Sequence, residues 1–225
     1  MFFNLRLLSL FFLIILFFNT NSAFAQDNAK RIEELTRLLQ ERYEKTNDIK
    51  ADFIQETIPA GGYEKIRSEG KVYFKRPDLM RWEYIRPERQ LIVTSNSEVY
   101  MYEEDARQVT VLAREQFLSS EISRAFFFGR GDIGKDFLIG PSELNGLDPR
   151  WSLKLIPLEN AGQVQTIWVS LDPRTHLVKE MWLEDQTGGK IHLLFKNIEV
   201  NTAIKSSLFD FVPPKGVEIY RPDGN

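Results

Sequence analysis

The sequence predicts a mainly β protein whose strands, about eleven of them, form one strongly curled or nearly closed antiparallel sheet. Short segments with a period of two recur along most of the chain and are separated by Gly, Pro, Asn and Asp turns. The connections are too short for parallel pairing, which needs crossovers of about a dozen residues or more. A single sheet with this number of strands usually curls.

The first 25 residues have the pattern of a secretory signal peptide. Arg6 is their one charge, an apolar run from Leu7 to Phe18 follows, and the segment ends Ala23-Phe24-Ala25 before Gln26. We expect residues 1–25 to be removed and 26–225 to form one domain. Because the chain has no Cys, an acyl anchor and disulfides are both excluded.

Charge excludes one class of partner. Without Arg6, 28 basic residues face 32 acidic ones, a net charge of −4. Nucleic-acid binding favours a strongly basic face, so no nucleic-acid partner is expected.

An amphipathic helix of about four turns is predicted after Gln26, with Asp27 or Asn28 as its cap. Its apolar stripe has helical spacing, and charged residues occupy the other side. The stripe consists of Ile32, Leu35, Leu38, Leu39 and Tyr43.

From Ile49 the period changes to two, and strands follow one another across short turns. The predicted strands are Ile49–Thr57, Ile66–Lys75, Met80–Ile85, Gln90–Ser95, Glu98–Tyr102, Gln108–Ala113, Phe137–Ile139, Trp151–Pro157, Gln163–Leu171, His176–Glu184 and Lys190–Val200. A second helix is predicted within Arg114–Gly129, where apolar residues return to helical spacing.

Several strands carry large apolar residues on one parity, as Met80, Trp82 and Tyr84 do. A plain hydrophobic core is the simpler interpretation of this pattern. The alternative is an apolar surface too wide to fill itself, covered by helices and able to hold a lipid.

Catalytic and metal-binding patterns are not found. His176 and His192 lack ligand spacing, and no Gly-x-Ser-x-Gly motif occurs. The stretch Gly129–Lys135 matches the start of a phosphate-binding loop, but Asp136 replaces the Ser or Thr that would hold magnesium. Because it also follows a helix and precedes a strand, a phosphate site is rejected. No enzyme activity, metal or cofactor is predicted.

Three stretches together resemble the outer-membrane lipoprotein carrier (LolA) family. They are Ala51-Asp52-Phe53-Ile54-Gln55, the segment from Gly70 through Arg76-Pro77 and Trp82 to Tyr84 with Pro87 and Leu91-Ile92-Val93 after it, and Leu208–Val217. The similarity runs from about Lys30 to Val217. It implies an incomplete antiparallel β-barrel with a helical lid over an apolar cavity.

The resemblance also implies a function and partners. Such a carrier takes acylated lipoproteins from an inner-membrane lipoprotein-releasing ABC transporter, crosses the periplasm as a monomer, and delivers them to an outer-membrane lipoprotein receptor. An exported carrier of a free lipid or glycolipid is the alternative, and an exported enzyme acting on envelope lipids is a third hypothesis.

Site residues follow from parity and from the family motifs. Arg76 matches a family position that holds the lid closed through hydrogen bonds to its backbone. The lid is expected to present Phe117, Leu118, Ile122 and Phe126. The cavity is expected to be lined by Phe53, Met80, Trp82, Tyr84, Leu91, Val93, Val99 and Met101.

Overall fold

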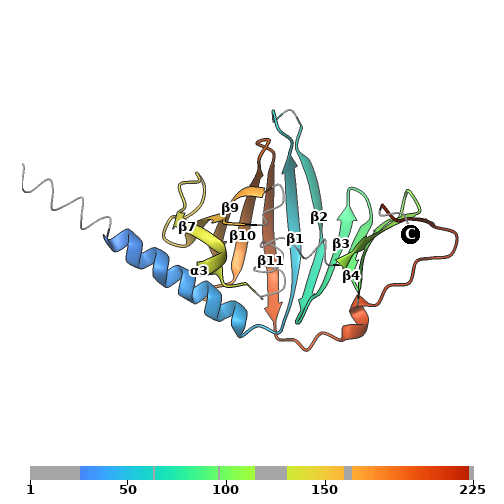
Figure 1. Cartoon of the computed structure of the whole chain (residues 1–225), viewed down its shortest axis with the longest axis horizontal. Helices are drawn as coiled ribbons and strands as arrows, with labels where there is room; N and C mark the ends of the chain where they lie inside the picture. Colours follow the sequence, from blue (N-terminus) through green and yellow to red (C-terminus); the bar gives the residue numbers. More distant parts are fainter. Residues whose placement is uncertain (1–25, 63, 96, 115–130, 160–163, 223–225) are drawn as a thin grey trace, which may run out of the picture.

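A computed structural model of the chain describes residues 26–62, 64–95, 97–114, 131–159 and 164–222. Within these residues twelve strands form one sheet, in the order β12-β6-β5-β4-β3-β2-β1-β11-β10-β9-β8-β7. The two edges, β12 and β7, do not pair with each other, so the sheet is an open, incomplete barrel (Figure 1). The predicted fold class, a mainly β chain with an incomplete antiparallel barrel, is confirmed.

Two antiparallel meanders build the sheet, and β1 and β11 join them in its centre. The eleven-residue strand β1 pairs with β2 on one side and with β11 on the other. The first meander comprises β1 (Asp48–Ile58), β2 (Ile66–Lys75), β3 (Leu79–Arg86), β4 (Gln90–Thr94), β5 (Glu98–Glu103) and β6 (Gln108–Ala113). The second comprises β7 (Phe137–Pro141), β8 (Ser152–Pro157), β9 (Val164–Leu171), β10 (Val178–Asp185) and β11 (Lys190–Val200).

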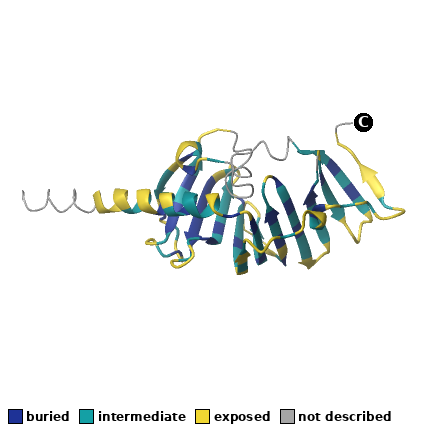
Figure 2. Cartoon of the chain, turned by 90° about the horizontal axis from the view of Figure 1, so that it is seen from below, coloured by how far each residue is buried: buried dark blue, intermediate teal, exposed yellow. Residues whose placement is uncertain are grey.

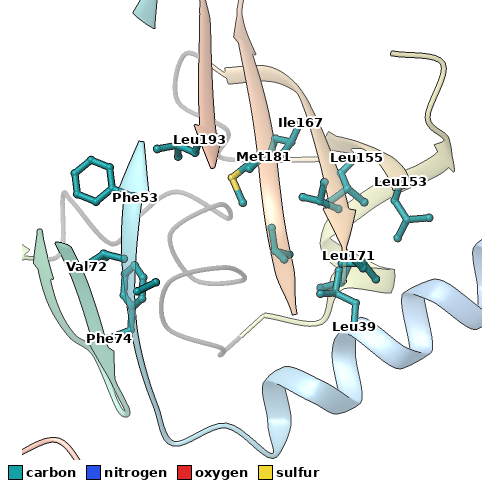
Figure 3. Packing of buried hydrophobic residues seen from close by; sticks show 14 of the residues in the cluster. Leu39, Phe53, Val72, Phe74, Leu153, Leu155, Ile167, Leu171, Met181 and Leu193 are labelled. Carbon is teal, nitrogen blue, oxygen red and sulfur yellow. The ribbon is translucent and has the colours of Figure 1, made fainter. Parts of the chain in front are cut away.

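The predicted N-terminal helix is helical over 26–44. Its buried residues Leu35 and Leu39 belong to the same apolar cluster as Leu153 and Leu171. Figure 3 shows Leu39 directed toward Leu171 at the base of the second meander. We call the face of the sheet that receives this helix the inner face, and the opposite one the outer face.

The twelfth strand, β12 (Glu218–Tyr220), was not predicted. After β11 the chain passes through the short 3-10 helix η2 (Ser206–Phe209) and then pairs in parallel with β6, so that β12 becomes the edge of the sheet. We call residues 201–220 the C-terminal strap; Figure 1 shows it running below the first meander. A three-residue exposed strand has no alternation for sequence analysis to detect.

The strap covers part of the outer face. The ring of Phe211 lies 5.3 Å from that of Tyr100 and 6.0 Å from that of Tyr102, and Arg81 donates to the Leu208 carbonyl (3.1 Å). Val93, Val109 and Val111 lie on the same face and are at most 4% exposed, and Phe209 of the strap is 1% exposed. The first meander is therefore packed on both faces, which Figure 2 shows as buried strands under an exposed strap.

Two further predictions concern residues outside the described ranges. The signal peptide (1–25) lies outside them, as does nearly all of the predicted helix in Arg114–Gly129. After that segment the chain forms a short helix, α3 (Ile133–Asp136), where sequence analysis expected only a Gly-rich connection.

Candidate functional site

An aromatic cluster occupies the inner face of the first meander. The Phe53 ring contacts those of Trp82 (centroids 4.7 Å apart) and Tyr84 (5.0 Å), both edge to face. Trp82 also meets Phe74 at 5.9 Å and Phe195 at 6.4 Å. Edge-to-face pairs at such distances stabilise by roughly 0.5–1.5 kcal/mol beyond the burial of their area. The structure thus brings Phe53, Trp82 and Tyr84 together, as their shared parity predicts.

Strand register extends this cluster across the first meander. Val72 pairs with Trp82, Trp82 with Ile92, and Ile92 with Met101. Directly opposed residues of an antiparallel pair point to the same face. Met80 has the same parity as Trp82, and its backbone N–H donates to the Thr94 hydroxyl. Val99 pairs with Thr94, which has the same parity as Ile92, so both Met80 and Val99 lie on the inner face.

The register corrects two predicted cavity positions. Leu91 pairs with Glu83, and Val93 with Arg81, so both leave β4 on the parity opposite to Ile92 and Trp82. They lie on the outer face, where Val93 is fully buried near the strap. The apolar residue of β4 that faces inward is Ile92, which was not predicted.

The second meander also contributes apolar residues to the inner face, which the predicted site omitted. Leu193 pairs with Met181, Met181 with Val169, and Val169 with Leu153. Met181, Leu193 and Leu155 belong to the same buried apolar cluster as Phe53 and Val72 (Figure 3). The sequence showed that the apolar residues of these strands fall on one parity. The motifs that resemble the family lie in other parts of the chain, so the predicted site did not include these strands.

A small hollow of about 30 Å³ lies between the two meanders and the end of the helix. Small-molecule sites typically measure about 300–1,000 Å³, so the hollow by itself is too small to hold a lipid. The lining residues are all apolar apart from the hydroxyl of one tyrosine: Tyr43, Ile49, Ala51, Val72, Phe74, Leu177, Val178, Met181, Phe195 and Ile198.

Arg76 anchors the N-terminal helix to the sheet. Its Nη2 donates to the carbonyl of Tyr43 at the C-terminal end of the helix (2.5 Å), and its backbone N–H donates to Asn47 (2.9 Å). A cation at this end also complements the helix dipole. The expected lid residues Phe117, Leu118, Ile122 and Phe126 lie outside the described residues. The role of Arg76 toward a lid therefore stays a prediction.

The turn that carries Arg76 also holds the chain where it leaves β6. Arg114, the last residue described there, forms a 2.7 Å ion pair with Asp78, and both side chains are largely buried. Thr94 donates its hydroxyl to the Asp78 carbonyl (3.0 Å). The connection between β2 and β3 is thus a shared attachment for the helix and for the segment after β6.

Toward the hairpin ends, the inner face of the first meander becomes polar. The hydroxyl of Tyr84 donates to Oε1 of Gln55 (3.0 Å), and burial raises the pKa of Tyr84 to about 12. At neutral pH this hydroxyl is therefore a neutral hydrogen-bond donor. The ring of Tyr84 belongs to the aromatic cluster, and its hydroxyl oxygen belongs to the polar end of the inner face.

In the stretch that resembles a phosphate-binding loop, backbone N–H donors are already bonded to a side chain of the same stretch. Asp132 caps α3, and its Oδ1 accepts from the backbone N–H groups of Gly134 (3.1 Å) and Lys135 (3.3 Å). The side chain of Lys135 also pairs with Asp132 (2.7 Å), so the carboxylate occupies the place an anion would take. Across the described ranges, no three His, Cys, Asp or Glu residues are grouped to hold a metal ion.

His192 lies on the outer face, away from the hollow. Its ring stacks on Trp182 (4.0 Å), and its Nε2 is 2.9 Å from a Glu180 carboxylate oxygen.

Of the helices that the structure describes, none has the length and apolar character to span a membrane.

The chain is similar to known proteins in family, sequence and fold. The family model "Outer membrane lipoprotein carrier protein LolA" matches residues 44–212. An outer-membrane lipoprotein carrier protein of Nitrosomonas europaea is 33% identical over 172 residues, covering 76% of this chain and 81% of its own. One from Azotobacter vinelandii is 28% identical over 195 residues, covering 87% and 90%. A solved LolA superfamily structure from Nitrosomonas europaea, 10% identical, aligns with a TM-score of 0.45 over 80% of this chain and 97% of its own.

Proposed function

The chain belongs to the outer-membrane lipoprotein carrier (LolA) family, and on that premise we propose that it carries lipoproteins across the periplasm with their acyl chains against the inner face. It receives them from an inner-membrane ABC transporter and delivers them to an outer-membrane receptor. The observation that carries this proposal is the continuous apolar inner face, from Met101 on β5 to Leu153 on β8.

Transfer free energies explain why such a face suffices without a catalytic group. Each CH₂ group removed from water stabilises by about 0.8 kcal/mol, so an acyl chain of ~16 carbons gains roughly 12–13 kcal/mol on burial. An apolar surface offsets most of the cost of crossing water. Release requires only that the next site bind somewhat better.

The proposed acyl contacts are the inner-face residues of the first meander together with the newly found β4 position. Met80 and Met101 supply unbranched, adaptable surface at either side of the aromatic cluster. Arg76 and the segment after β6 are proposed to control access, because both attach at the connection between β2 and β3. The proposed contacts are Phe53, Met80, Trp82, Tyr84, Ile92, Val99 and Met101.

Adjacent residues of β4 permit a sharp test. A photoreactive amino acid at Ile92 faces the inner side, and the same amino acid at Leu91 faces the outer side. After crosslinking in the periplasm, we expect acylated proteins in adducts from position 92 and few from position 91. Free lipid alone at position 92 would favour a carrier of free lipid or glycolipid. Equal labelling from both positions, or no acyl-bearing adduct at 92, would contradict the proposal.

A further inference from the structure

The inner face of the first meander ends in a belt of uncharged polar groups. These residues lie at the hairpin ends, one step beyond the aromatic cluster, and the register places them on one face. Gln55 pairs with Ser68, Gly70 with Tyr84, and Tyr84 with Gln90, which in turn pairs with Glu103. We call Gln55, Ser68, Tyr84 and Gln90 the polar rim; Glu103, the next residue on this face, is charged and is not part of it.

The polar rim lines a hollow of about 410 Å³ that is open to solvent. Its amide and hydroxyl groups are partly exposed, so they can exchange water for a ligand. Gln55 accepts from Tyr84 and donates to Thr57 (3.1 Å), which orients its amide. The hollow adjoins the aromatic cluster through Tyr84, so a molecule with acyl chains below would place its polar part here.

The charges around this hollow are mainly negative. Its lining contains three carboxylates, Glu88, Glu103 and Asp105, and one cation, Arg89, a net charge of −2. Arg89 already pairs with Glu104 (3.8 Å). Arg86 pairs with Glu69 (3.2 Å). Glu69 is on the outer face, because its register partner Ile54 is on that face. An anion placed in the hollow would meet like charge without a free cation among the lining residues.

We propose that the polar rim binds the uncharged linkage between the acyl chains and the polypeptide of the cargo, and that its acidic surroundings disfavour anionic phospholipids. Ester and amide groups are neutral hydrogen-bonding partners that match glutamine amides and hydroxyls. A phosphate group matches them poorly, because like-charge juxtaposition opposes binding. This inference rests on the proposed function and adds the means by which a lipoprotein is distinguished from membrane lipid.

Three probes separate the parts of this proposal: a synthetic N-acylated S-diacylglyceryl-cysteinyl pentapeptide, hexadecanol, and dipalmitoyl phosphatidylglycerol. Their binding is measured by displacement of a fluorescent alkyl probe from the mature protein. For the double variant Gln55→Leu, Gln90→Leu we expect about tenfold weaker lipopeptide binding, from the loss of two or so hydrogen bonds. Hexadecanol binding should change by less than about twofold. Gln186→Leu, an exposed glutamine in the turn between β10 and β11, is the matched control.

The possible outcomes are distinguishable. Unchanged lipopeptide binding, or equal losses for lipopeptide and hexadecanol, would overturn the role of the rim while leaving the carrier function in place. A wild-type protein that binds hexadecanol or phosphatidylglycerol but no lipopeptide would overturn the proposed function itself. The variant Glu103→Gln, Asp105→Asn tests charge without enlarging either side chain. It should bind phosphatidylglycerol several-fold more tightly, and unchanged binding would overturn the discrimination.

Discussion

The ring of Phe53 on β1 lies directly over Gly70, its register partner on β2. A Cβ atom at Gly70 would approach Cε1 of Phe53 to 2.9 Å and the backbone carbonyl oxygen of Glu83 to 1.9 Å. The absent side chain leaves the space in which Phe53 meets both Trp82 and Tyr84. Glycine within a strand often marks such a close approach. The family motif that begins at Gly70 therefore has a steric reason at its first residue.

Gly70→Ala should destabilise the protein by about 1–3 kcal/mol, because the methyl group must displace the β3 backbone as well as Phe53. Urea unfolding measures the change. Gly140→Ala on β7 is the control, since nothing lies within 4 Å of its added Cβ and its change should stay within about 1 kcal/mol. Equal unfolding midpoints for the two variants would contradict this account of Gly70.

Arg76→Leu should release the end of the N-terminal helix. The lost hydrogen bond to the Tyr43 carbonyl corresponds to roughly 1–2 kcal/mol. Hydrogen exchange over residues 36–44 should therefore accelerate about tenfold, and bound acyl probe should dissociate faster. Arg67→Leu, an exposed arginine at the other end of β2, is the control. Unchanged exchange and release would remove Arg76 from the site.

The strap makes a testable contribution to stability through Phe209. Its side chain is 1% exposed, so Phe209→Ala should cost about 3–5 kcal/mol, the range for a buried aromatic residue. Val212→Ala, three residues later and 84% exposed, should change stability by at most about 0.5 kcal/mol. Thermal or urea denaturation of both variants measures the difference. Similar small effects would show that the strap does not complete the fold.

Acid should weaken the contact between Arg221, the residue after the strap, and β5. The Tyr100 hydroxyl and the Arg221 guanidinium, both bonded to Glu98, hold the pKa of that carboxyl below its usual value. Because the folded-state pKa is the lower one, the contribution is complete above the unfolded-state pKa of about 4.3 and is lost as the pH falls through the folded-state value.

Glu98→Gln should therefore be less stable than the wild type at pH 7, and the difference should shrink below about pH 4. Urea midpoints between pH 7 and pH 3 measure this, with Glu64→Gln in the exposed connection between β1 and β2 as the control. A difference independent of pH would mean that Glu98 acts through packing rather than charge.

Alternation and turn residues were enough to predict eleven of the strands, the N-terminal helix and the inner position of Trp82 and Tyr84. The inner side of β3 can be recognised in the sequence because polar residues alternate with its apolar ones. These polar residues, Arg81 and Glu83, are on the outer side, where Arg81 contacts the strap. Where one face of a strand is exposed to solvent, the alternation of polar and apolar residues identifies the buried face. The family motifs then predicted what such a face could bind.

Only the tertiary structure decided which side of β4 faces inward. Leu91, Ile92 and Val93 are all apolar, so alternation is absent and the parity is undetermined by sequence. The strap, which arrives from more than a hundred residues away, covers the outer face near Val93, and the pairing of Ile92 with Trp82 selects the inner residue. A strand buried on both faces has no polar side to mark its orientation, and its neighbours alone set it.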